Sequence, residues 1–327
     1  MRHRRFVMAS TLVMLAVAAA SGAALYWSHT VRAFSLAHPE ALTSLPADCQ
    51  FVFGANVRKL VASPFYAQAR QGGSLALPLG GDLGSFIEAT GVDPSRDVTS
   101  LVAGGRSTSG AGRGVVIVDG SFDTNRISAY IRSKWAPAER QYRGVSMFLI
   151  PDGHDGAERG VALLSSRQVV AGDLELLRSV LDTRAGQSGS ILQNASLYSL
   201  IGSVNTDAML WFAGNAAGVL SRAPLNTPLG PNIGSIQNVT GSLDITNAVV
   251  GTVTAQAASA EAASKLADVL RGFLALGQLS GDQNPDLKSL LGGLSVTQEG
   301  DQVRLSLNLP LDLLQKLRGP KAAPGRQ

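Results

Sequence analysis

The chain offers few residues with which to build a nucleophilic active site. His154 is the only histidine after residue 38, and no Gly-x-Ser-x-Gly elbow is present. Acyl transfer needs a nucleophile, a neighbouring base and a group that orients the base. A Ser-Lys pair would need Lys59, Lys134, Lys265 or Lys288, and nothing in the sequence singles one out. We therefore predict that the protein is not an enzyme and has no catalytic residues.

Two loops resemble ligand-binding motifs only superficially. PDGHDG at 151–156 crowds Asp152, His154 and Asp155, but it lacks the alternating ligands and the later Glu of a calcium loop. GGRSTSGAGRG at 104–114 is rich in glycine, yet a phosphate loop opens a helix, whereas this run leads into a strand-like segment. We predict a solvated hairpin tip and a flexible hairpin loop, with no metal and no cofactor.

Acidic residues and the single cysteine have simple local interpretations. In GVDPSRD, Gly91 ends a helix over residues 83–90, and Asp93 precedes a proline. Asp93 and Asp97 are therefore predicted to be turn and cap residues, not an acid-base pair. One cysteine excludes an internal disulfide. Cys49 is predicted to be a small buried apolar residue beside the first strand.

The charge distribution argues against nucleic acid as a partner. The net charge is +4, but seven of the 28 basic residues lie in residues 1–5 and 316–326, which leaves 21 against 24 acidic residues between. Binding to a duplex needs Lys and Arg clustered on one face. With 45% hydrophobic and 16% charged residues, the body is instead predicted to be globular.

The N-terminus predicts a membrane segment. Residues 6–27 form an uncharged run of 22 residues, which is long enough for a helix to cross about 30 Å of hydrocarbon. Arg2, Arg4 and Arg5 precede it and only Arg32 follows closely, so the N-terminus is expected in the cytoplasm and the bulk in the periplasm. The alternative is a cleaved signal peptide, because small residues at 18–24 offer cleavage sites.

An order of elements occurs twice along the chain. The first series has a strand at 50–57, a helix at 58–70, a hairpin of 98–103 with 114–122, a helix at 125–135, a hairpin of 145–150 with 160–171, and a helix at 173–181. The second has a strand at 207–214, strands at 236–245 and 248–256, a helix at 260–276, strands at 294–298 and 302–309, and a helix at 311–317. This agreement indicates an internal duplication.

The predicted fold is therefore α+β. Each half is expected to be a mostly antiparallel sheet with helices packed on one face, after one N-terminal transmembrane helix. The helix at 260–276, capped by Ser259, should bury Ala262, Leu266, Val269, Leu270 and Phe273. The divisions are a cytoplasmic end (1–5), a signal-anchor (6–27), a stalk (28–44), a first half (45–184), a connecting helix within 185–205, a second half (206–317) and a disordered tail (318–327).

Three segments carry a resemblance to a known group. They are LPADCQFVFGANVRKLVASPFY from residue 45, IEATGVDPSRDVTSLVAGG from residue 87 and GVVIVDGSFDTNRISAYI from residue 114. With the Pro-Ala-Asp opening at 46–48, the turn at 90–98 and Gly-x-Phe-Asp at 120–123, the chain resembles uncharacterised exported or membrane-anchored bacterial proteins of acidobacterial and planctomycete type. The resemblance covers about residues 45–135. It implies a fold and no activity.

Two functions follow from these observations. The first is a membrane-anchored extracytoplasmic interaction or scaffold module, with an envelope protein as a possible partner. The second is a carrier or sensor for an apolar ligand such as a lipid, bound between the two halves. It is suggested by the charge-poor stretch 185–315, which has 5 basic and 9 acidic residues, and by apolar loops at 223–225 and 228–229.

Overall fold

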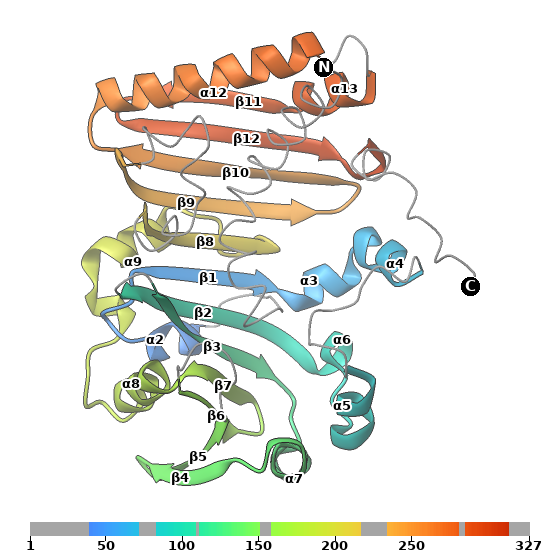
Figure 1. Ribbon diagram of the computed structural model, residues 1–327, viewed down its shortest axis with the longest axis vertical. Coiled ribbons are helices and arrows are strands. Elements are labelled where there is room, and N and C mark those ends of the chain that lie inside the picture. Colours follow the sequence, from blue (N-terminus) through green and yellow to red (C-terminus); the bar gives the residue numbers. More distant parts are fainter. Residues whose placement is uncertain are drawn as a thin grey trace.

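The computed structural model describes residues 39–71, 83–108, 111–150, 158–216, 234–280 and 285–313. It combines helices with one large antiparallel sheet of twelve strands (Figure 1). The strands are β1 (Phe51–Asn56), β2 (Val98–Thr108), β3 (Ala111–Gly120), β4 (Ala138–Tyr142), β5 (Val145–Ile150), β6 (Arg159–Ser165), β7 (Gln168–Asp173), β8 (Leu210–Asn215), β9 (Ile236–Ile245), β10 (Ala248–Ala257), β11 (Leu294–Glu299) and β12 (Gln302–Pro310).

The helices connect these strands or precede them. They are α2 (Pro39–Ser44), α3 (Val57–Ala62), α4 (Pro64–Gln71), α5 (Leu83–Thr90), α6 (Pro94–Asp97), α7 (Thr124–Trp135), α8 (Leu174–Arg184), the 3-10 helix η2 (Ile191–Gln193), α9 (Ala195–Gly202), α12 (Ala260–Ser280) and α13 (Pro285–Gly292). Among the helices in the described ranges, none is both long and apolar enough to span a bilayer. The run 6–27 lies outside those ranges.

The strand order is symmetric about the central pair β1–β8. One side runs β2, β3, β7, β6, β5, β4, and the other runs β9, β10, β12, β11. Each side therefore continues with one hairpin and then a second hairpin, and β4–β5 is an addition on the first side only. Phe51 to Ala55 pair with Gly214 to Leu210 at the junction, so the two sides form one continuous sheet and not two sheets.

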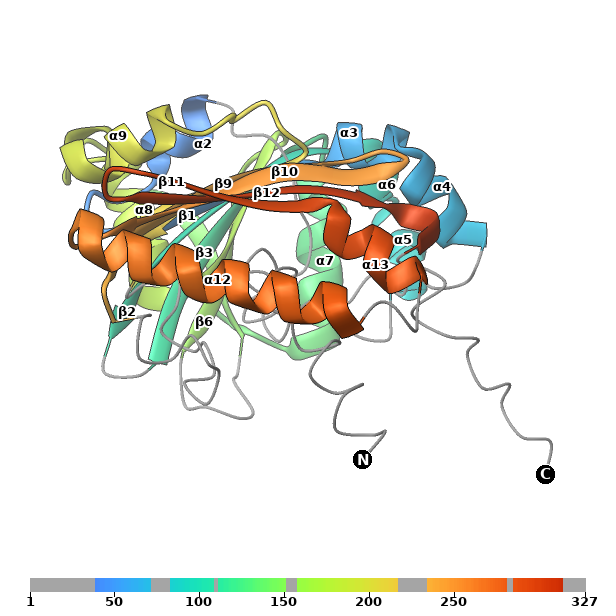
Figure 2. The same ribbon diagram turned by 90° about the horizontal axis from the view of Figure 1, so that it is seen from above.

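Helices cover both faces of this sheet. Face A is the side on which Val52, Val102 and Trp211 lie, and α2, α8 and α9 pack there. Face B is the opposite side, with Phe53 and Leu307, where α7, α12 and α13 pack. Figure 2 shows α2 and α9 on one side and α12 and α13 on the other. The prediction of helices on one face is thus wrong for the first side, which is sandwiched between α8 and α7.

The core on face A explains why the body begins before residue 45. Ala41 of α2 is fully buried and Leu45 follows it into the same cluster, against Leu177 and Leu181 of α8. Residues 39–44, predicted as the end of a stalk, therefore belong to the folded body. Burying a leucine side chain such as that of Leu45 contributes about 1.5–3 kcal/mol.

The prediction of a flexible loop is wrong for residues 104–108 and 111–114 of the glycine-rich run. They form the ends of β2 and β3, which pair from Gly104 with Val115 out to Thr108 with Ala111. The glycines are needed for close packing. A Cβ on Gly104 would lie 2.9 Å from Leu45, and one on Gly105 would lie 2.4 Å from the Arg113 carbonyl.

Three other boundaries differ from the prediction. The stretch 160–171 contains a turn, so β6 and β7 form one hairpin, and β5 pairs with β4 and β6. The predicted helix 58–70 is two helices, broken at Ser63 before Pro64. The connecting segment is η2 followed by α9, with Asn194 accepting from Leu197 N. The helix boundaries coincide with Ser63 and Asn194, whose side chains compete for backbone hydrogen bonds, and with Pro64, which has no backbone N–H to donate.

The long helix α12 packs on a narrower stripe than the sequence predicts. Ala263, Leu266 and Ala267 are buried, whereas Val269 and Phe273 are only half-buried. Because Ala263 and Ala267 are small, the helix lies close to the sheet there. These two residues, and not Val269 and Phe273, therefore make the buried contact with Val303 of β12. Ser259 caps it as predicted, accepting from Ala262 N at 3.1 Å. Of the predicted helix 311–317, only 311–313 are described.

Candidate functional site

The acidic turn has the local role that the sequence predicts. Asp93 caps α6 by accepting from Ser95 N at 2.9 Å, and Gly91 has a left-handed φ of 72°. The Asp97 carboxylate accepts from Arg96 and from the Asp93 backbone N. The hydrogen bond from Arg96 holds the pKa of Asp97 below its ordinary value. An ionised residue with these partners serves a turn and is not poised as a general acid.

The other residues considered for chemistry do not converge. PDGHDG at 151–156 lies outside the described residues. Lys59 donates to the Asp207 carbonyl, and Lys265 pairs with Glu261 at 2.6 Å. Within the described ranges, no three His, Cys, Asp or Glu side chains are placed to share a metal ion.

Cys49 lies in the core on face A. It is 2% exposed, and its Sγ lies next to the space above Gly104. Burial raises the pKa of the thiol from 9.0 to about 12. The thiolate is the nucleophilic form, so this environment opposes reactivity.

We expect Cys49 to resist thiol reagents. At pH 8 an aromatic disulfide reagent should label the folded protein at least about 100-fold more slowly than the denatured protein, because the neutral buried thiol is not attacked. A Ser196→Cys variant, with a thiol on the exposed side of α9, should label within seconds. Because the folded pKa is the higher one, stability should hold below about pH 9 and fall as the pH rises toward 12. Fast labelling of Cys49 under native conditions would contradict this placement.

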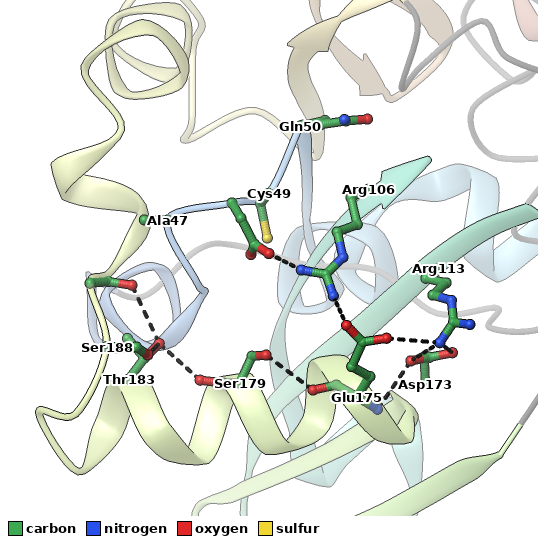
Figure 3. Close-up of polar contacts among 12 residues, drawn as sticks. Ala47, Cys49, Gln50, Arg106, Arg113, Asp173, Glu175, Ser179, Thr183 and Ser188 are labelled. Atoms are coloured by element: carbon green, nitrogen blue, oxygen red, sulfur yellow. Dashed lines mark hydrogen bonds and ion pairs between the residues drawn. The ribbon is translucent and has the colours of Figure 1, made fainter. Parts of the chain in front are cut away.

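A network of ion pairs joins three separate segments near the turn end of the β2–β3 hairpin (Figure 3). Arg106 contacts the carboxylates of both Asp48 and Glu175. Arg113 lies 3.1 Å from Glu175 and 3.3 Å from Asp173. The network therefore links the segment before β1, the β2–β3 hairpin and the start of α8.

Every charge in this network already has a partner. Asp173 also caps α8 by accepting from Glu175 N at 3.1 Å, and its side chain is 9% exposed. Just before β1, the Gln50 side chain accepts from Ser107 N, and Asn194 donates to the Ala47 carbonyl. These contacts fasten residues 47–50 to the sheet. We interpret the network as a structural clamp and not as a ligand site.

The second side of the sheet carries a solvent-exposed surface that is not part of this clamp. We define the polar sheet surface as face A of β9, β10, β12 and β11. Its outward residues are Asn238, Thr240, Ser242, Asp244, Val250, Thr252, Thr254, Gln256, Gln302, Arg304, Ser306, Asn308, Ser295, Thr297 and Glu299. Alternate residues such as Val253, Val303 and Leu307 point to face B and are buried under α12 and α13.

Pairing in the sheet arranges this surface in rows. One row is Thr240, Thr254, Arg304 and Thr297, and the next is Ser242, Thr252, Ser306 and Ser295. Neighbouring strands lie about 4.8 Å apart, and side chains on one face repeat about every 6.8 Å. The result is a regular array of hydroxyl and amide groups, all exposed or half-buried except Thr240.

The array deepens into a cleft where it meets α9. The cleft has a volume of about 90 Å³ and is lined by Leu200, Ser203, Asn238, Thr240, Thr254, Gln256, Gln302 and Arg304. Asn238 Nδ2 donates to Gln256 Oε1 at 2.8 Å, and Gln256 Nε2 donates to Asp301 at 3.1 Å. This relay fixes both amides. The cleft can therefore offer oriented hydrogen-bonding groups and one guanidinium.

The sequence reasoning did not single out this surface, although its signal was present. In β9, Asn238, Thr240 and Ser242 alternate with Val239 and other inward residues. Period-two alternation predicts a strand with one wet face. Low charge in this half had instead suggested an apolar ligand, but most of the outward groups are polar and neutral.

Comparison with known proteins supports the fold alone. No family model and no curated protein sequence matches the chain. The chain is similar in structure to TP0453 in its crystal form I, with a TM-score of 0.50 and 12% sequence identity over 86% of this chain and 97% of that one. Crystal form III of TP0453 gives a TM-score of 0.46 at 10% identity, covering 85% and 97%. At this identity the likeness to TP0453 carries no residue-level role.

Proposed function

We propose that the protein is a membrane-anchored extracytoplasmic interaction or scaffold module without catalytic activity, and that the polar sheet surface is where it meets its partner. Its N-terminus lies in the cytoplasm, residues 6–27 cross the bacterial inner membrane, and the body is in the periplasm. The exposure of an ordered polar face on β9–β12 is the observation that carries this proposal.

Support for the surface comes from what covers the rest of the sheet. On the first side, α8 follows β7 and buries Val102, Ile117 and Val170 on face A. After β12, the described residue Leu313 packs with the face B cluster instead. The two sides, which we propose arose by duplication, therefore differ at the polar sheet surface. A difference of this kind is expected where one copy has acquired a binding role.

Support for the anchor comes from the sequence and from where the body begins. The uncharged run ends at residue 27, and the described residues begin with α2 at Pro39. From there the chain passes the clamp at residues 47–50 and enters β1 in the middle of the sheet. A pull on the anchor would reach a strand that is hydrogen-bonded on both sides, which suits a scaffold.

The alternative of a lipid carrier has less support. It requires an apolar space between the halves, but β1 and β8 are hydrogen-bonded neighbours there. Trp211 is fully buried over Gly54 at this junction. The junction is thus a packed strand pair.

Fractionation of the source bacterium tests the anchor. We expect the full chain in the inner membrane at its unprocessed mass, with the body digested by protease in spheroplasts but not in intact cells. Deleting residues 6–27 should leave the protein in the cytoplasm. A shorter mature chain free in the periplasm would establish the cleaved signal peptide, and full-length protein in the cytosol would overturn both forms of export.

In-cell crosslinking tests the surface. A Thr252→Lys/Thr254→Lys variant should lose crosslinks to its envelope partner, because two long charged side chains would stand in the centre of the array. A Ser146→Lys variant on the exposed part of β5 is the matched control and should keep them. Equal crosslinking by both variants would remove the polar sheet surface from the proposal.

A further inference from the structure

The cleft at the end of α9 holds an uncommitted guanidinium among neutral polar groups. We propose that it binds a sugar unit bearing one carboxylate, as part of an envelope glycan. This inference rests on the proposed function, since it names the chemistry of the partner that the polar sheet surface would meet.

Arg304 supplies the charge that selects a carboxylate. Its side chain is exposed near the start of β12, and among the described residues it has no ion pair, unlike Arg106 and Arg113 of the clamp. Its register neighbours are Thr254 and Thr297, which are neutral. A guanidinium presents a planar fork of donors that matches a carboxylate in two parallel hydrogen bonds.

The remaining lining groups fit a hydroxyl-rich ring. Thr240 and Thr254 each carry a hydroxyl that both donates and accepts, whereas the Ser203 hydroxyl donates to the Leu200 carbonyl at 2.7 Å and is left to accept. The amides of Asn238 and Gln256 are held by their relay before any ligand arrives. Leu200 adds one half-buried apolar contact for the C–H face of a sugar.

The composition of the whole surface disfavours an ordinary protein interface at this place. The centres of protein interfaces are enriched in Tyr, Trp, Phe, Met and Arg and depleted in Ser. The array here is mainly Ser, Thr, Asn and Gln. Such groups exchange hydrogen bonds with water for hydrogen bonds with hydroxyls, which suits a hydrated glycan.

Neighbouring acids restrict the ligand to a low charge. Glu299 pairs in register with Gln302, and Asp301 accepts from Gln256, so two carboxylates border the cleft. A polyanion such as nucleic acid would meet both of them. A single carboxylate placed on Arg304 would not.

Titration of the full-length protein in detergent micelles with sodium glucuronate tests the proposal. Ligand-observed NMR should detect binding of glucuronate and much weaker binding of glucose and of sodium acetate. Arg304→Gln should weaken glucuronate binding about tenfold or more, because a charged hydrogen-bond pair is lost. Thr254→Val, which removes a hydroxyl at nearly constant volume, should weaken glucuronate and glucose alike. Arg140→Gln, on the exposed edge strand β4, is the matched control and should bind as the natural chain does.

Every result of this titration either supports or overturns the assignment of a carboxylate-bearing sugar to the cleft. Selective glucuronate binding that requires Arg304 supports the proposal. Equal affinity for inorganic phosphate and glucuronate, equal binding by Arg304→Gln, or no binding of glucuronate at any soluble concentration would overturn it. The fractionation and crosslinking results would still stand in that case, so failure of the ligand assignment is distinguishable from failure of the interaction module.

Discussion

Gly54→Ala should be among the most damaging single-methyl changes in this protein. A Cβ at residue 54 would lie 2.3 Å from Cε2 and 2.4 Å from Nε1 of Trp211, which is fully buried. The indole cannot yield, because it is rigid and belongs to the packed core on face A. Overpacking of this kind costs about 1–3 kcal/mol and occasionally more. Gly54→Val should cost more still and reduce the yield of folded protein.

The measurement is chemical unfolding of the full-length protein in micelles, followed by tryptophan fluorescence. Gly272→Ala, on α12 with open space around the new methyl, is the control and should stabilise by about 0.5–1 kcal/mol. Combining Gly54→Ala with Trp211→Leu should recover part of the loss, since the double variant has room for the methyl. If Gly54→Ala matched Gly272→Ala, the contact at the junction of the two sides would be wrong.

The junction also shows why part of the fold lies beyond sequence reasoning. Strand patterns at β1 and β8 were recognisable in the sequence, because each is an apolar run flanked by turns. Their pairing depends on Phe51 meeting Gly214 and Gly54 meeting Trp211, across more than 150 residues. Neither contact leaves a periodic signal. Two separate sheets were therefore as consistent with the sequence as one.

The prediction of a flexible loop at 104–114 was wrong for the same reason, because it could not include contacts between residues distant in sequence. In local terms, GGRSTSGAGRG indicates a flexible turn. Its glycines are instead required by partners distant in sequence, as Gly104 accommodates Leu45 and Gly105 accommodates Phe51. By contrast, Asp93 and Ser259 were identified as turn or cap residues correctly, because a cap acts within three residues of itself.

The candidate site combines a local pattern, which the sequence shows, with long-range contacts, which it does not. Alternation in β9, β10 and β12 is local and could have been counted from the sequence. That Arg304 lies beside Thr254 and across from α9 is not local, since the cleft brings together segments near residues 200, 240, 255 and 303. The sequence could thus predict a wet face but not the cleft in it.

Asp173→Ala should also be strongly destabilising, because one carboxylate holds both the start of α8 and the clamp. Loss of an N-cap costs about 1 kcal/mol. Loss of the ion pair with Arg113, which keeps Glu175 as a partner, should add about 1 kcal/mol. We therefore expect a loss of about 2 kcal/mol in the free energy of unfolding.

Two variants separate the cap from the ion pair. Asp173→Asn keeps a good N-cap and removes the charge, so it should cost only the ionic part, about 1 kcal/mol, and this part should shrink in high salt. Asp123→Ala removes the cap of α7, where the exposed carboxylate accepts from Asn125 N and Arg126 N, and should cost about 1 kcal/mol regardless of salt. Because α8 buries Leu176, Leu177 and Val180 under face A, a frayed first turn would loosen the whole first side. Equal losses for Asp173→Ala and Asp123→Ala would mean that the clamp contributes nothing beyond the cap, and that residues 47–50 are held by their backbone hydrogen bonds alone.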